Sequence, residues 1–236
     1  MIGIICAMQL EADKIQNEMQ ITGSERISGM EFVCGSLCGQ EIVLALCGVG
    51  KVFAAVCAEA MILRYAPACI LNSGVAGTLT DKLSIGDIAI ADKLVQHDMD
   101  TTAVGDPPGL ISGINTVYFE ANPRICRTLE AAADAVGVKS YRGTIASGDQ
   151  FMSDPEKKVR IRDMFGAIAC EMEGAAIAQA AYINKIPFCV LRAISDSADG
   201  QAQMEYPKFA AMAAERSFAI LREFLLHFQF NTNAIS

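Results

Sequence analysis

Short apolar runs alternate with segments of helical periodicity along most of the chain. The apolar runs span residues 2–8, 41–47, 68–74, 86–92, 166–170 and 187–194. The helical patterns span residues 52–65, 123–136, 155–164, 174–184 and 206–228. Continuous apolar runs are typical of strands buried on both faces, and their interleaving with helices is typical of βαβ units. The pattern therefore predicts a three-layer α/β/α fold around a central, mainly parallel twisted sheet.

Residues 31–47 break this alternation. Two apolar runs meet there at Gly39 and Gln40, which is typical of an antiparallel hairpin, so the sheet is expected to be mixed. No internal repeat or low-complexity segment is visible in the sequence. Since 52% of the 236 residues are hydrophobic, the chain can fill one large core. We predict a single domain over residues 1–236.

One long irregular stretch covers residues 97–113 and is rich in proline and glycine. Loops of this length are either disordered or functional, often as lids over a site. The sequence leaves both interpretations open.

Charge narrows the choice of partner. The net charge is −8, and the basic residues are scattered, so neither nucleic acid nor an anionic membrane is an expected partner. The N-terminus lacks the basic start and cleavage site of a signal peptide, and no uncharged apolar run reaches the length of a transmembrane helix. We expect a soluble cytoplasmic protein that binds a small molecule or another chain.

The nine cysteines suggest core packing and not metal binding. Their number is odd, no C-x-x-C spacing occurs, and only two histidines accompany them, so neither disulfides nor zinc is predicted. We expect no metal and no cofactor. Five thiols lie in apolar runs and are predicted to be small, reduced core residues: Cys6, Cys47, Cys69, Cys170 and Cys189.

Acidic residues follow several of the apolar runs, and the carboxyl ends of strands are where open α/β sheets bind ligands. Glu11 follows the first run, Glu171 and Glu173 follow the fifth, and Asp196 follows the last. Each acid alone could be a helix-terminal or turn residue. Together they place carboxylates at three strand ends, and converging carboxylates suit acid/base chemistry on a glycosidic bond. The residues thus predict an acidic small-molecule site.

Two glycine-rich segments are weaker signals. The segment CGVGKV lacks the spacing of a phosphate loop, because Ala45 and Val52 stand where glycine and a hydroxyl residue are required. The segment SGVAG is too short for a dinucleotide fingerprint and indicates only a close backbone approach at Gly74 and Gly77.

Eight segments resemble, in order and from end to end, the purine nucleoside phosphorylase and uridine phosphorylase superfamily. They are IGIICAMQLEAD, CGVGKVFAA, LNSGVAGTL, GDIAIAD, HDMDTTAVG, SGDQFM, CEMEGAAIA and VLRAISDSAD. Within that superfamily the resemblance is to the 5'-methylthioadenosine/S-adenosylhomocysteine nucleosidases. It implies a nucleoside phosphorylase-like fold, a homodimer whose sites are completed by the partner subunit, and release of adenine from a 5'-thioribose in methionine salvage.

The resemblance also implies roles for individual residues. Asp196, held near Ser195, would protonate adenine at N7. Glu11, with Arg192 nearby, would deprotonate the attacking water, and Glu173 would bind the ribose hydroxyls. The other positions expected to bind substrate are Met8, Val75, Gly77, Phe151, Met152, Glu171 and Met172.

The chain departs from the family pattern at two places. Val75 stands where a serine commonly helps to hold the water, and Val104, Asp106 and Pro107 stand in the lid where aromatic residues often line the 5' pocket. The position of the water and the identity of the 5' substituent therefore stay open.

Three other functions compete with this one. A phosphorolytic relative would need several arginines around an anion, whereas only Arg192 lies near a strand end. The chain could instead release adenine from an aminofutalosine-type substrate. A non-catalytic nucleoside-binding protein is supported only by Val75, and the joint presence of Glu11, Glu173 and Asp196 argues against it.

Overall fold

The computed structural model describes residues 1–196 and 202–228. Its strands are β1 (Ile2–Cys6), β2 (Gln20–Ile27), β3 (Met30–Leu37), β4 (Gln40–Leu46), β5 (Cys69–Thr78), β6 (Ile88–Gln96), β7 (Phe119–Glu120), β8 (Ser140–Ser147), β9 (Ala167–Glu171) and β10 (Phe188–Asp196). Its helices are α1 (Gln9–Glu18), α2 (Lys51–Tyr65), the 3₁₀ turn η1 (Thr102–Val104), α3 (Pro123–Ala135), α4 (Pro155–Phe165), α5 (Gly174–Ile183) and α6 (Ala202–His227).

The strands form one mixed sheet that partly closes on itself. β10 pairs with both β5 and β6, and the path continues through β8 and β9 back to β5, so these five strands make a ring. β1, β4, β3 and β2 extend the sheet outward from β5. Parallel pairing joins β1 to β4 and β5, β5 to β10, and β8 to β6 and β9, whereas β3 and β4 form the predicted antiparallel hairpin. The mixed sheet is confirmed.

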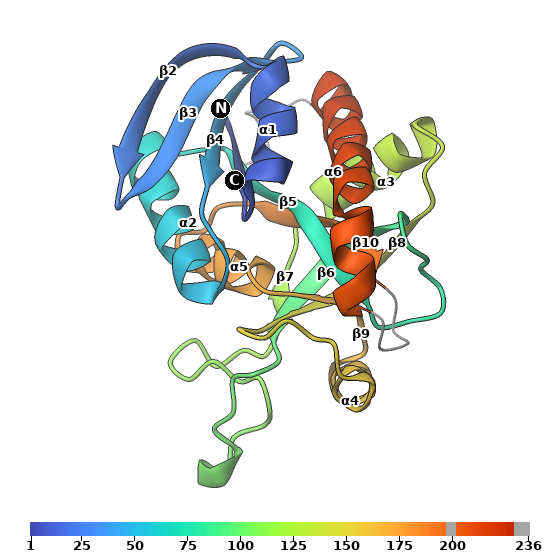
Figure 1. Ribbon diagram of the computed structural model, residues 1–236. Helices are drawn as coiled ribbons and strands as arrows, with labels where there is room; N and C mark the ends of the chain where they lie inside the picture. Colours follow the sequence, from blue (N-terminus) through green and yellow to red (C-terminus); the bar gives the residue numbers. More distant parts are fainter. Residues whose placement is uncertain (197–201, 229–236) are drawn as a thin grey trace.

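Helices cover both faces of the sheet (Figure 1). α6 packs against α1 and α3 on one face, while α2 packs against α5 on the other. α3 and α4 begin with the same N-terminal cap. The side chain of Asn122 or Asp154 accepts hydrogen bonds from two backbone N–H groups of the first turn, and a proline directly follows the capping residue. These caps fix where α4 starts, and α4 is the helix that flanks the site described below.

Five elements were not predicted: β2, β7, β8, α1 and the 3₁₀ turn η1. β2 is almost entirely exposed and polar, because it is the edge strand of the sheet, so it lacks an apolar run. β8 carries Gly143 and polar residues in its first half. α1 begins at Gln9, directly after the apolar run at residues 2–8, and three of its ten residues are buried: Glu11, Ala12 and Ile15.

The core agrees with the sequence pattern. All five cysteines that were predicted to be core thiols are buried, and β1, β9 and β10 are buried along their whole length. Burial of consecutive residues is what strands covered on both faces require. Among the described helices, none combines the length and apolarity needed to cross a membrane.

The irregular stretch at residues 97–113 projects from the body of the molecule (green in Figure 1). Asp106 accepts hydrogen bonds from Thr101 and Ser112 within the stretch, and Ile111 pairs with Thr116 just beyond it. At its tip, the side chain of Val104 is 81% exposed. This shape leaves the segment available to contact another molecule.

Candidate active site

A pocket of about 340 Å³ opens where β1, β5, β9 and β10 end. All twelve residues that the sequence suggested line it: Met8, Glu11, Val75, Gly77, Phe151, Met152, Glu171, Met172, Glu173, Arg192, Ser195 and Asp196. Six residues not suggested by the sequence also line it: Ala7, Val49, Ala76, Gln150, Lys158 and Cys170. The pocket is large enough for a nucleoside-sized ligand. Residues 197–199 of the RAISDSAD motif lie outside the described residues.

Glu11 is buried and held by the backbone. Its Oε2 accepts hydrogen bonds from the N–H groups of Ala7 and Met8, both at 3.1 Å, and its Oε1 accepts one from Val75 at 3.2 Å. Burial raises the pKa of Glu11 above its ordinary value, although Arg192 and these N–H donors oppose the shift. Val75 thus contributes its backbone N–H to the site. Glu11 is held by this N–H, which does not require a serine side chain at position 75.

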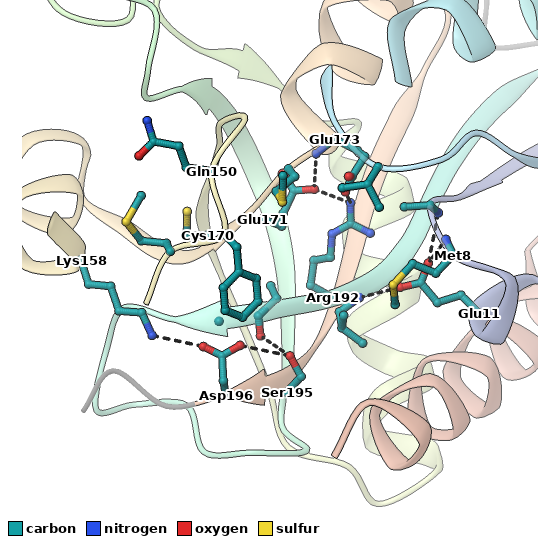
Figure 2. A pocket seen from close by; sticks show the side chains of 18 residues that line it. Met8, Glu11, Gln150, Lys158, Cys170, Glu171, Glu173, Arg192, Ser195 and Asp196 are labelled. Atoms are coloured by element: carbon teal, nitrogen blue, oxygen red, sulfur yellow. Dashed lines mark hydrogen bonds and ion pairs between the residues drawn. The ribbon is translucent and has the colours of Figure 1, made fainter. Parts of the chain in front are cut away.

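Arg192 stands at the centre of the carboxylates (Figure 2). It is almost completely buried, and its guanidinium donates to Glu171 and to the side-chain carbonyl of Asn72. Burial alone would raise the pKa of Glu171, but Arg192, the Ser147 hydroxyl and backbone N–H groups more than offset this and leave it lowered. Glu171 is therefore a charged anchor for Arg192.

Glu173 is oriented by Gly50 at the start of α2. The N–H of Gly50 donates to Oε1 of Glu173 at 2.8 Å, and Arg192 Nη2 lies 3.8 Å from the other oxygen. Gly50 has φ 102° and ψ 161°, a conformation essentially restricted to glycine. The CGVGKV segment therefore serves as a strand-to-helix turn that presents one N–H to the site. Burial and the adjacent Glu171 carboxylate raise the pKa of Glu173 to about 7.

Asp196 forms a second cluster with Ser195 and Lys158 (Figure 2). Its Oδ1 accepts a hydrogen bond from the Ser195 hydroxyl at 3.2 Å, and its Oδ2 lies 3.1 Å from Lys158 Nζ. A Cβ at position 77 would come within 2.6 Å of Oδ2, so Gly77 makes the room in which the carboxylate sits. The sequence indicated a close approach at Gly77, and the structure shows that Asp196 makes it.

Apolar side chains form the remaining walls. Met152 is buried, Met8 and Met172 are half-buried, and Phe151 is 47% exposed at the mouth. Val49 lies there too, with half its surface exposed. The pocket therefore combines polar groups at its base with apolar surface toward its opening, as small-molecule sites usually do.

Lys158 is the chemically important residue that the sequence interpretation missed. The signal was present in the periodicity of α4, whose buried residues are Lys158, Ile161 and Phe165. Spacings of three and four residues place them on one face of the helix. A lysine in register with two apolar residues indicates a buried ammonium group that requires a partner.

The raised pKa of Glu173 predicts a pH dependence of stability. Between pH 4.5, the ordinary value, and about 7, the folded protein holds a proton that the unfolded chain releases, so Glu173 lowers the free energy of unfolding as the pH rises through this range. Glu173→Gln should flatten the dependence by up to roughly 3 kcal/mol. Urea unfolding of both proteins at several pH values measures it. Exposed Glu31→Gln is the control and should keep the wild-type pH dependence. If the free energy of unfolding of Glu173→Gln changed with pH as steeply as that of wild type, the prediction would be contradicted.

This architecture places the protein among the nucleoside phosphorylase-like α/β enzymes. The chain belongs to the phosphorylase superfamily, whose family model matches residues 1–226. It is 37% identical, over 96% of its length and 99% of the relative, to the 5'-methylthioadenosine/S-adenosylhomocysteine nucleosidase of Shewanella loihica.

Solved structures agree with the sequence comparison. The nucleosidase of Neisseria meningitidis, in complex with methylthio-immucillin-A, superposes with a TM-score of 0.92 at 33% identity, covering 96% of this chain and 99% of that one. The futalosine hydrolase of Helicobacter pylori superposes with a TM-score of 0.90 at 34% identity, covering 95% and 96%. The resemblance suggested by the motifs is thus confirmed at the level of family and fold.

Proposed function

We propose that this protein hydrolyses the N-glycosidic bond of 5'-methylthioadenosine and S-adenosylhomocysteine, releasing adenine and a 5-thio-substituted ribose. The observation that carries the proposal is the pairing, in one buried pocket, of a backbone-held carboxylate at Glu11 with a separate carboxyl cluster at Asp196 (Figure 2). Nucleosidases of this name are among the relatives of the chain.

The two clusters suit the two halves of the reaction. Asp196 protonates N7, so that adenine leaves as a neutral base, and Glu11 takes a proton from the water that adds to C1'. The ribose becomes cationic as the bond breaks, and Glu173 stabilises this charge and binds the hydroxyls. Phe151 and Met152 contact the base, and Met8, Met172 and Val49 contact the sugar and its 5' group.

Water, and not phosphate, is the proposed nucleophile. Among the described residues that line the pocket, Arg192 is the one arginine, and its Nη2 is paired with the carboxylate of Glu171 and also donates to Asn72. An anion entering near Glu11 would be repelled by that carboxylate, whose hydrogen-bond donors are already used, whereas phosphate sites use several free donors. The charges around the pocket therefore favour hydrolysis.

Release of free adenine tests the proposal. Purified protein should convert 5'-methylthioadenosine and S-adenosylhomocysteine to adenine, detected by chromatography, without added cofactor. A second candidate substrate is an aminofutalosine-type nucleoside, because a futalosine hydrolase superposes as well as the thioadenosine enzymes do. The three nucleosides are compared at equal concentration. Binding without release of adenine from any of them would contradict the proposal.

A homodimer is the proposed assembly. α2 and α5 pack together and expose Val52, Phe53, Tyr182 and Ile183. Val49, which lies at the pocket mouth just before α2 in the sequence, is also exposed. Light scattering should give twice the chain mass of 25.2 kDa. Val52→Glu should weaken the dimer, whereas Val159→Glu, on the exposed side of α4, should not. A single species of 25.2 kDa in the wild type would contradict this prediction.

The remaining expectations from the sequence belong to the same proposal. We infer that residues 1–236 act as one domain, that the protein works in the cytoplasm, and that its reaction serves methionine salvage. The projecting stretch at residues 97–113 is the segment that would reach the partner subunit and close its 5' pocket.

A further inference from the structure

Lys158 is buried beside the proposed acid. Its side chain is 2% exposed, that of Asp196 is 4% exposed, and Nζ lies 3.1 Å from Oδ2. The residues around it on α4 are mostly exposed, so the helix turns this one lysine inward. Burying an ammonium group costs several kcal/mol unless it is paired. Because the Lys158–Asp196 pair is buried in the pocket, where removing both charges from water is unfavourable, we looked for a chemical role of the lysine.

The pair has a consequence for acid catalysis. A carboxyl group can protonate a leaving base only if it carries a proton, and a carboxylate held in an ion pair does not. In the Lys158–Asp196 pair the transferable proton resides on nitrogen, in direct contact with the oxygen that needs it. We propose that Lys158 supplies the proton that Asp196 passes to the leaving base. This inference rests on the proposed function.

The proton transfer balances as follows. An N–H bond of Lys158 breaks as an O–H bond of Asp196 forms, and that O–H bond breaks as N7–H forms. The C1'–N9 electron pair moves onto the base, which leaves neutral, while water adds to C1' and gives its proton to Glu11. Solvent then reprotonates Lys158 and takes the proton from Glu11. Lys158 acts through Asp196, so it is a positioning residue that also carries a proton.

Other titratable groups in the pocket can also affect the pH dependence of the rate, and the test must separate them from Lys158. They are Glu11 on α1, Cys170 and Glu171 on β9, Glu173 before α5, and Arg192 on β10. Burial raises the pKa of Cys170 well above its ordinary value, so that thiol stays neutral. Glu171 and Arg192 stay charged as an ion pair. The pKa of Glu173 is raised to about 7, inside the tested pH range, but Glu173 and Glu11 are present in wild type and variants alike, so the ratio of variant to wild-type rate at each pH isolates Lys158.

The test compares Lys158→Met and Lys158→Arg with wild type. Arginine keeps the positive charge but does not release its proton, so a proton carrier is lost in both variants. Each should lower kcat for adenine release by about 10- to 100-fold at pH 7.5, within the range of general-acid effects. The deficit of Lys158→Met should shrink as the pH falls toward 5.5, because solvent protons can then load Asp196 directly. Exposed Lys157→Met should match wild type.

Each other outcome has a defined meaning. A Lys158→Arg enzyme with the wild-type rate would overturn the inference and leave the charge alone as the function of the residue. A deficit of Lys158→Met that is constant from pH 5.5 to 7.5, or that accompanies a lost thermal transition, would assign Lys158 a structural role and also overturn it. Failure of the wild type to release adenine would instead remove the proposed function, so the two failures are distinguishable.

Discussion

Asp196→Asn is expected to lower the rate of adenine release by about 10² or more, because asparagine keeps the shape of the side chain but has no acidic proton to give. Asparagine can still accept the Ser195 hydroxyl bond, so the substrate should still bind. The rate is measured with 5'-methylthioadenosine under saturating conditions. Exposed Asp163→Asn on α4 serves as the control and should match wild type. A variant at Asp196 with more than a tenth of the wild-type rate would remove it as the acid.

The same residue should select the base. A carboxyl group can donate to N7 and accept from the amino group at C6 of adenine, whereas a 6-oxopurine places an acceptor against an acceptor. Sites that hydrogen-bond a particular group reject analogues that lack it strongly. Adenosine-type substrates should therefore be cleaved in preference to inosine-type ones, and comparable turnover of the two would contradict the role of Asp196.

The sequence predicted the buried half of the fold well. Continuous apolar runs identify β1, β4, β5, β6, β9 and β10 because strands covered on both faces have no polar alternation. It could not predict β2, which is exposed, nor the closure of the ring, because pairing of β10 with both β5 and β6 depends on contacts far apart in the chain. The sequence contains no local signal for such a closure.

The sequence predicted which residues form the site but not which residues they contact. Strand ends and motifs identified Glu11, Glu173 and Asp196, since position at a strand end is a local property. The partners were not predictable, because Gly50 reaches Glu173 across 123 positions and Lys158 reaches Asp196 across 38. Those partners determine whether each carboxyl group is charged, so the chemistry of the site depends on long-range contacts.

Glu11 has the other large expected effect. Glu11→Gln keeps the shape of the side chain and one carbonyl oxygen for the backbone N–H groups, but it removes the base that would deprotonate water. Ligand binding should persist while kcat falls by about 10² or more, the pattern expected when an interaction acts chiefly in the transition state. Isothermal titration with a non-hydrolysable thioadenosine analogue, alongside the rate of adenine release, separates binding from turnover.

The identity of the nucleophile follows from the same carboxylate. Because Arg192 is already bound by Glu171 and Asn72, and Glu11 would repel an approaching anion, adenine release should not depend on phosphate, and the sugar product should be free 5-methylthioribose. The measurement is product analysis by mass spectrometry, with and without millimolar phosphate, for wild type and Glu11→Gln. A phosphorylated sugar, or a rate that rises with phosphate, would place the protein with the phosphorolytic members of the superfamily and replace water as the nucleophile.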